Sequence, residues 1–190
     1  AALEELRAGA EPGTTGRTGT TNGAAMRVAP VGIAFPLTRP ELLADAVPLA
    51  ARLGVVMGIE NVDGDDVTSL TKAMEFVDAV DSPYLQLYPD LGNIAEQGLD
   101  PGVELTAGEG HMVAMHAKDV RPGEPRRVEM GTGIVDWDRS FALLTAQDWS
   151  GRLMIEMWND DAPDSLSRCT AARAFIEDRA ASAGLLVVSP

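Results

Sequence analysis

Hydrophobic residues follow two alternating patterns along this chain, short continuous runs and stripes at helical spacing. The short runs predict buried strands at residues 55–60, 85–90, 112–116 and 153–156. The stripes predict helices at 40–53, 101–107, 138–147 and 163–183. They also predict a helix that carries the stripe from Leu70 to Val80 and is capped by Asp65 or Asp66. Strands that alternate with helices build right-handed βαβ units around a parallel sheet. We therefore predict an α/β fold whose strands are covered on both faces.

Each predicted strand ends in a polar side chain that can bind a metal ion. These four residues are Glu60, Asp90, His116 and Glu156. In parallel sheets the reactive groups gather outside the carboxyl ends of the strands, so we expect the four to converge. Taken singly, such a residue is more often a helix cap or a hydrogen-bonded structural group. Four of them at the same topological position favour one shared divalent ion, Mn²⁺ or Mg²⁺, with Zn²⁺ or Co²⁺ as alternatives.

Residues 1–36 do not share this regularity. The stretch 9–23 contains five Gly and five Thr, a composition that buries too little apolar surface to offset the entropy of ordering it. We expect residues 1–36 to be a flexible, low-complexity segment and residues 37–190 to form the folded domain.

The composition excludes several classes of function. A formal net charge of −14 argues against binding to nucleic acid, which requires a basic face. No apolar run approaches the roughly 18 residues of a membrane span, and the start of the sequence lacks the pattern of a signal peptide. We therefore expect a cytoplasmic protein without a membrane partner. Cys169, the single cysteine, cannot form an intramolecular disulfide, and its helical spacing from Ile176 predicts a core position.

Five blocks of sequence carry a resemblance to a known family. They are GIENVD (58–63), YLQLYPDLGN (84–93), GHMVAMHAKD (110–119), MGTGIVDW (130–137) and LMIEMW (153–158). In this order they resemble the L-ribulose-5-phosphate 3-epimerases, also called L-xylulose-5-phosphate 3-epimerases, which are xylose-isomerase-like TIM barrels. The similarity extends from about Thr38 to Gly184 and corresponds to the second half of the family's barrel. The resemblance implies four βα units, the C-terminal half of a (β/α)₈ barrel.

The same resemblance implies an isomerase and gives roles to individual residues. The implied reaction is the metal-dependent 3-epimerisation of a ketopentose 5-phosphate, L-ribulose 5-phosphate or L-xylulose 5-phosphate, by removal and return of the C3 proton. Glu60 and Glu156 would form the acid/base pair. The divalent ion would be held by Glu60, Asp90, His116 and Glu156. The substrate, a small sugar phosphate, would contact Asn93, Lys118 and Arg121, and we expect a homo-oligomer.

Other interpretations of these residues stay open. The chain could be another xylose-isomerase-like isomerase or metallohydrolase, or a catalytically inactive half-barrel that serves oligomerisation or regulation. Gly131 and Gly133 could let backbone N–H groups approach an oxyanion, although so short a glycine pattern is a weak signal. His111 precedes its strand, which favours a structural role for this second histidine.

Overall fold

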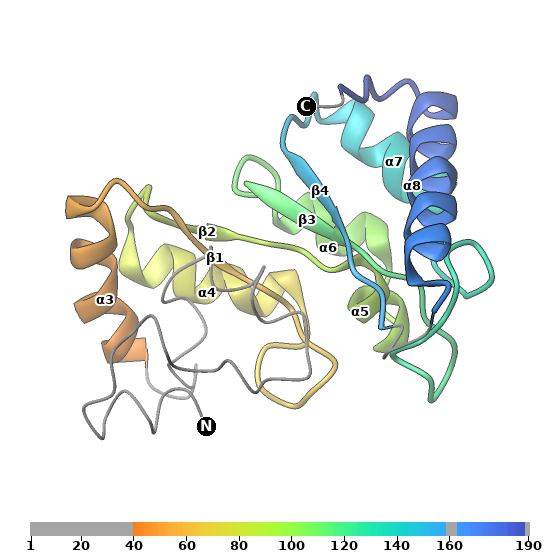
Figure 1. The fold of residues 1–190 in the computed structure, drawn as a ribbon. Helices are drawn as coiled ribbons and strands as arrows, with labels where there is room; N and C mark the ends of the chain where they lie inside the picture. The colour runs from red at the N-terminus through yellow and green to blue at the C-terminus, as the bar shows by residue number, and fades with distance from the viewer. Residues whose placement is uncertain (1–39, 159–162, 189–190) are drawn as a thin grey trace. The chain divides into compact units, whose positions relative to one another are not determined.

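The structure is a computed structural model that describes residues 40–158 and 163–188. The predicted flexible segment 1–36 lies outside the described residues and stays a prediction. Within these ranges strands and helices alternate, with two helices between the second and third strands (Figure 1). The strands are β1 (Met57–Ile59), β2 (Leu85–Leu87), β3 (Ala114–Ala117) and β4 (Arg152–Ile155). The helices are α3 (Pro40–Arg52), α4 (Leu70–Val80), α5 (Leu91–Glu96), α6 (Pro101–Ala107), α7 (Trp137–Ala146) and α8 (Ser165–Ser182).

The four strands run parallel, in the order β1, β2, β3 and β4. β1 pairs with β2, and β3 pairs with β4, over their whole lengths. In the described residues β2 and β3 meet at two isolated bridges, Leu87 with Met112 and Asp90 with His116. The second bridge joins two of the predicted metal ligands, because it lies just beyond the carboxyl end of β2.

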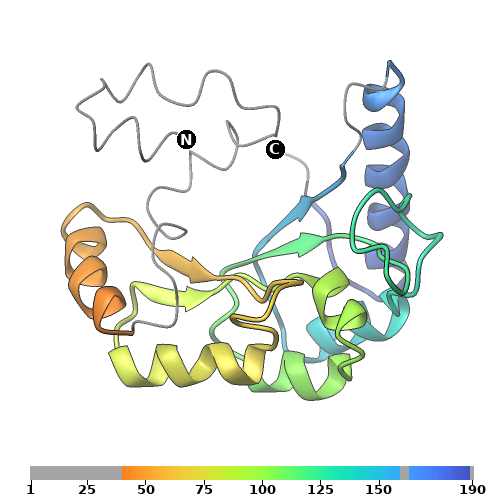
Figure 2. The same cartoon turned by 90° about the horizontal axis from the view of Figure 1, so that it is seen from below.

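The helices form a layer along one side of the strands (Figure 2). α4 packs on β2, α5 on β3 and α8 on β4, while α3, α4, α6, α7 and α8 pack on one another in that order. Between the two layers the strand residues Leu85, Leu87 and Met115 are fully buried against helix residues such as Leu70 and Phe141. Burial of these large apolar side chains stabilises the layer that positions the strand ends.

The start of α4 differs from the prediction. Its cap is Ser69, whose Oγ accepts the N–H of Lys72 at 3.1 Å, and not Asp65 or Asp66. The two aspartates lie in a loop that the N–H of Val62 closes by donating to the Val67 carbonyl. The helix therefore begins only after this loop, in agreement with the preference of Ser for the cap position.

A short helix after β2 was not predicted. α5 follows Asp90 directly, and Oδ1 of Asp90 accepts the N–H of Asn93 at 2.7 Å. Six residues are too few to give a recognisable helical stripe in the sequence. Asp90 therefore ends the β2 segment and caps a helix at the same time.

The C-terminal elements are more exposed than the sequence predicted. β4 alternates exposed and half-buried residues instead of being covered on both faces, and Met154 is 46% exposed. Cys169 is exposed on α8, so its predicted core position was wrong. The buried side of α8 consists of Ala172, Ile176 and Ala180, which starts one turn beyond the cysteine. No helix in the described ranges is long and apolar enough to cross a membrane.

Candidate metal centre

Four side chains come together at the carboxyl ends of the strands. Glu60 follows β1 and Asp90 follows β2, while His116 belongs to β3 and Glu156 follows β4. One ligand atom from each residue lies within 4.8 Å of the other three. The chain thus brings all four predicted ligands into one cluster, because neighbouring parallel strands end at the same edge of the sheet.

The Nδ1 atom of His116 is the centre of this cluster. It lies 2.9 Å from Oε1 of Glu60, 3.0 Å from Oε2 of Glu156 and 3.7 Å from Oδ2 of Asp90. The imidazole is buried, and the ring of Tyr88 packs edge-on against it with centroids 4.7 Å apart. Three carboxylates around one ring nitrogen favour a positive charge between them, either a proton or a metal ion.

The electrostatics of the cluster agree with this arrangement. Burial works to lower the pKa of His116, but the hydrogen bonds to Glu156 and Glu60 outweigh it and raise the pKa to about 10. Burial works to raise the pKa of Glu156, yet the hydrogen bond from His116 and the charge of Lys118 lower it to about 2. For Asp90, burial dominates and raises the pKa to about 7. In the metal-free protein a proton on His116 thus provides the positive charge.

The spacing of the ligand atoms fits a single divalent ion. Around an ion with bonds of about 2.1 Å, adjacent ligands of an octahedron lie about 3 Å apart and opposite ones about 4.2 Å apart. The separations of 2.9, 3.0 and 3.7 Å from His116 Nδ1 fall in this range. Oδ2 of Asp90 is buried and accepts no hydrogen bond among the described residues, and its ion-pair partner Lys118 Nζ lies 3.4 Å away, so this oxygen keeps a lone pair that a metal ion could bind. Three carboxylates and one imidazole also match the donor preference of Mn²⁺ or Mg²⁺.

The residues predicted to contact substrate are held by other protein groups. Asn93 and Lys118 are both buried, and Nζ of Lys118 donates to Oδ1 of Asn93 at 2.6 Å. Lys118 Nζ also lies 3.4 Å from Oδ2 of Asp90. Arg121 binds Thr132 through Nε and Nη2 at 3.1 and 2.8 Å. Their contact with a substrate stays a prediction, and their contacts within the chain tie them to the cluster edge and to the long loop.

The glycine pair of the long loop does not offer free N–H groups. Gly131 and Gly133 both donate their N–H to Oδ2 of Asp119, at 2.8 and 2.9 Å. Oδ1 of the same carboxylate accepts from Val120 and Val135. In this conformation the glycine N–H groups therefore bind the carboxylate of Asp119, and binding of an anionic ligand by them stays untested. Asp119, which directly follows Lys118, was not predicted to have this role.

A contact to Glu156 was also not predicted. The indole Nε1 of Trp158 donates to Oε1 of Glu156 at 3.1 Å. The guanidinium of Arg126 lies over the Trp158 ring at 5.3 Å and forms an ion pair with Asp63 at 2.8 Å. The indole therefore occupies one oxygen of Glu156 and leaves Oε2 facing His116. The spacing of Glu156 and Trp158 in the LMIEMW block was the available signal.

The second histidine lies at the opposite end of β3. His111 precedes the strand, and its Nδ1 is 3.1 Å from Oε1 of Gln86. This placement agrees with the structural role expected from the sequence, and it makes His111 a useful control for His116.

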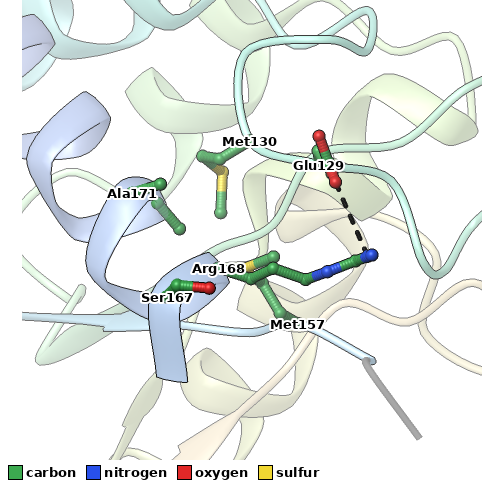
Figure 3. Close-up of a pocket in the computed structure, with 7 residues that line it drawn as sticks. Glu129, Met130, Met157, Ser167, Arg168 and Ala171 are labelled. Carbon is green, nitrogen blue, oxygen red and sulfur yellow. Dashed lines mark ion pairs between the residues drawn. The ribbon is translucent and has the colours of Figure 1, made fainter. Parts of the chain in front are cut away.

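A separate pocket of about 350 Å³ is lined in part by Met157, the residue that follows Glu156. Its lining consists of Glu129, Met130, Met157, Ser167, Arg168, Ala171 and Ala172. Figure 3 shows the Arg168 side chain reaching towards Glu129, with 3.5 Å between Nη1 and Oε1. None of the predicted site residues is among these lining residues. The metal cluster and this pocket are therefore distinct features of the described chain.

Comparison with known proteins identifies relatives of this chain. The L-ribulose-5-phosphate 3-epimerase UlaE of Escherichia coli O157:H7 is 37% identical over 144 residues, which are 76% of this chain and 51% of that protein. The UlaE protein of Salmonella paratyphi B is 38% identical over the same length. The chain thus spans about half the length of these relatives. A family model described as ADP-ribosylglycohydrolase matches residues 1–57, where the sequence predicted no family.

Solved structures share the fold of the described region. A structure of L-ribulose 3-epimerase has a TM-score of 0.65 at 22% identity, covering 78% of this chain and 55% of that chain. The D-psicose 3-epimerase of Clostridium cellulolyticum H10 has a TM-score of 0.64 at 15% identity, covering 77% of this chain and 55% of the other. These matches confirm the prediction of a partial barrel. The family model described as xylose isomerase-like TIM barrel matches residues 38–180, and the chain therefore belongs to this family.

Proposed function

We propose that Glu60, Asp90, His116 and Glu156 bind one divalent metal ion, and that the chain carries the metal centre and acid/base pair of a sugar-phosphate 3-epimerase. The observation that supports this most is the convergence of three carboxylates on Nδ1 of His116 at 2.9 to 3.7 Å. The proposed substrate is a ketopentose 5-phosphate, L-ribulose 5-phosphate or L-xylulose 5-phosphate. The names of the relatives at 37 and 38% identity support this choice.

The reaction requires removal of the proton on C3 of the sugar. The neighbouring C2 carbonyl acidifies it, since the electron pair of the broken C–H bond can move onto the carbonyl oxygen. A divalent ion held by the cluster would supply Lewis-acid stabilisation of the negative charge that develops there. Mn²⁺ or Mg²⁺ is the proposed ion.

Inversion at C3 requires a base on one face of the carbon and an acid on the other. Glu60 comes from β1 and Glu156 from β4, so the two carboxylates reach His116 from opposite ends of the described row of strands. One of them takes the C3 proton, and the other returns a proton to the opposite face. The direction of the reaction decides which carboxylate acts first. Trp158 holds one oxygen of Glu156 and so limits the rotation of this carboxylate.

The test of this function is exchange of the C3 proton with deuterated solvent. The full chain is incubated with L-ribulose 5-phosphate and Mg²⁺ or Mn²⁺, and deuterium incorporation at C3 is measured by mass spectrometry. We expect metal-dependent incorporation that EDTA removes and that the His111→Ala control retains. A folded, metal-loaded chain that exchanges neither L-ribulose nor L-xylulose 5-phosphate would contradict the epimerase and favour a metal-binding but inactive half-barrel.

A further inference from the structure

Four buried polar side chains form a continuous network beside the cluster. Asn61, Asp90, Asn93 and Lys118 are 0, 0, 2 and 4% exposed. They come from the segment after β1, the end of the β2 segment, α5 and the segment after β3. Burial of so many polar groups is unfavourable unless they are hydrogen-bonded to one another. The contacts between them therefore indicate what the network holds in place.

Asn61 joins the ends of the first two strand segments. Its Oδ1 accepts the N–H of Asp90 at 2.8 Å, and its Nδ2 donates to the Asp90 carbonyl at 3.1 Å. Backbone pairing between β1 and β2 stops at Ile59 and Leu87. The side chain of Asn61 thus continues the strand pairing where the backbone no longer does. Because Asn61 directly follows Glu60, this bond pair holds the backbone next to Glu60 against the backbone of Asp90.

Asn93 fixes the rotation of the Asp90 carboxylate. Its backbone N–H donates to Oδ1 of Asp90 at 2.7 Å, which turns Oδ2 towards His116. Its side-chain Nδ2 donates to the Asn61 carbonyl at 2.8 Å, and its Oδ1 accepts from Lys118. An ammonium group can only donate, so Lys118 determines which end of the Asn93 amide faces Asn61. Each side-chain amide therefore has one orientation that satisfies all its neighbours.

We propose that Asn61 and Asn93 are positioning residues, which hold the Glu60 and Asp90 carboxylates at ligand distance before a cation binds. This inference rests on the metal-binding part of the proposed function. The amide pair restricts the backbone segments that carry the two carboxylates, so less ordering accompanies binding. Groups that orient metal ligands in this way typically change metal affinity about 10- to 100-fold when they are removed.

The first experiment compares the Mn²⁺ dissociation constants of folded variants of the full chain. Asn61→Ala is expected to bind Mn²⁺ about 10- to 100-fold more weakly than the unmodified chain. Asn93→Ala is expected to lose about 10-fold, because its backbone N–H still holds Oδ1 of Asp90. Asn93→Ala removes the side-chain bonds of Asn93 to the Asn61 carbonyl and to Lys118, and it keeps both Asn61–Asp90 bonds and the backbone bond to Oδ1 of Asp90. It therefore tests the Asn93 side chain by itself. Titration calorimetry is done where circular dichroism gives the same helix content for every variant.

Glu104→Ala is the matched control. Glu104 is also buried and connects α6 to α4 through Leu70 and Thr71, at 2.6 to 3.3 Å. It has no described contact with the cluster, so this variant loses a buried polar connection without disturbing the ligands. We expect its Mn²⁺ affinity to equal that of the unmodified chain. The positioning role would be overturned if Asn61→Ala and Asn93→Ala bound Mn²⁺ as tightly as the unmodified chain does. It would also be overturned if Glu104→Ala lost as much Mn²⁺ affinity as they do.

A second measurement separates this inference from the metal-binding proposal. The N–H of His116 donates to the Pro89 carbonyl at 2.7 Å, a bond that does not include Asn61. In the metal-free protein, hydrogen exchange at His116 should become at least about 10-fold faster in Asn61→Ala and stay unchanged in Glu104→Ala. If the unmodified chain binds no Mn²⁺, the metal proposal fails, and this rate alone decides the positioning role. Unchanged exchange in Asn61→Ala would then exclude it.

Discussion

The Nδ1 atom of His116 lies 2.9 Å from Oε1 of Glu60, although 56 positions separate the two residues in sequence. β2 lies between the strands that carry them, so their side chains meet over the end of this intervening strand. Asp90, at the end of the β2 segment, also approaches this nitrogen, with its Oδ2 atom 3.7 Å from Nδ1 of His116. The contact therefore closes the cluster around a position that a cation can occupy.

His116→Ala should abolish Mn²⁺ binding, because it removes the nitrogen on which the three carboxylates converge. We expect the dissociation constant to rise by more than about 100-fold, beyond the range typical of groups that only orient a ligand. His111→Ala should bind Mn²⁺ as the unmodified chain does, since His111 contacts Gln86 before β3. Titration calorimetry at pH 7.5 measures both. Similar affinity in the two variants would contradict the assignment of His116 as a ligand.

Glu60→Gln and Glu156→Gln should each slow C3 proton exchange by roughly 10²- to 10⁴-fold for one of the two epimers, the usual contribution of a positioned acid or base. The two variants should differ according to the epimer that is supplied. The variant that keeps the base for that epimer should still release its C3 proton, whereas the other should not. Deuterium incorporation into L-ribulose and L-xylulose 5-phosphate is the measurement. Glu129→Gln, at a carboxylate that is 60% exposed outside the cluster, is the control.

The metal-free protein should lose stability as the pH rises above neutrality. The hydrogen bonds to Glu156 and Glu60 raise the pKa of His116 from 6.5 to about 10. Protonated His116 therefore stabilises the fold fully below about pH 6.5, and this contribution is lost as the pH rises to about 10. Urea midpoints measured in EDTA at pH 6, 8 and 10 should fall accordingly.

The same pH series has two internal checks. His116→Gln should flatten the dependence, whereas His111→Gln should keep it. Addition of Mn²⁺ should stabilise the protein more at pH 8 than at pH 6, because a metal ion competes with the proton for the imidazole nitrogen. A midpoint in EDTA that rises between pH 6 and 10 would show that His116 is not protonated between the carboxylates.

Asp119→Ala should destabilise the long loop, because the carboxylate of Asp119 accepts N–H groups from four residues: Val120, Gly131, Gly133 and Val135. We expect a loss of roughly 1 to 3 kcal/mol in the free energy of unfolding, since one buried and three less buried donors lose their acceptor. Hydrogen exchange at Gly131 and Gly133 should accelerate. Asp138→Ala, at a carboxylate that is 72% exposed, should change neither measurement. Slow exchange at both glycines in Asp119→Ala would exclude this role.

The success of the sequence predictions depended on the kind of feature. Long amphipathic stripes predicted α3 and α7 to within about two residues, because burial of one helix face gives a periodic pattern in the local sequence. The six-residue helix α5 left no such record. The cap of α4 was placed at Asp65 or Asp66, although both lie in a loop closed between Val62 and Val67. Several residues could have served as the cap, and only the path of the loop distinguishes them.

The sequence by itself determined the order of βα units and the polar residue at the tip of each strand. Both follow from the local alternation of apolar and polar positions, which parallel strands convert into a shared edge. Only the tertiary structure decided which polar atoms meet there. Asn61 is hydrogen-bonded to Asp90, Asp119 is hydrogen-bonded to Gly133 in the long loop, and Cys169 is exposed. The local periodicity of apolar residues predicts none of these three features. The physical reason is that hydrogen bonds and burial at these positions depend on how segments distant in sequence are placed against each other.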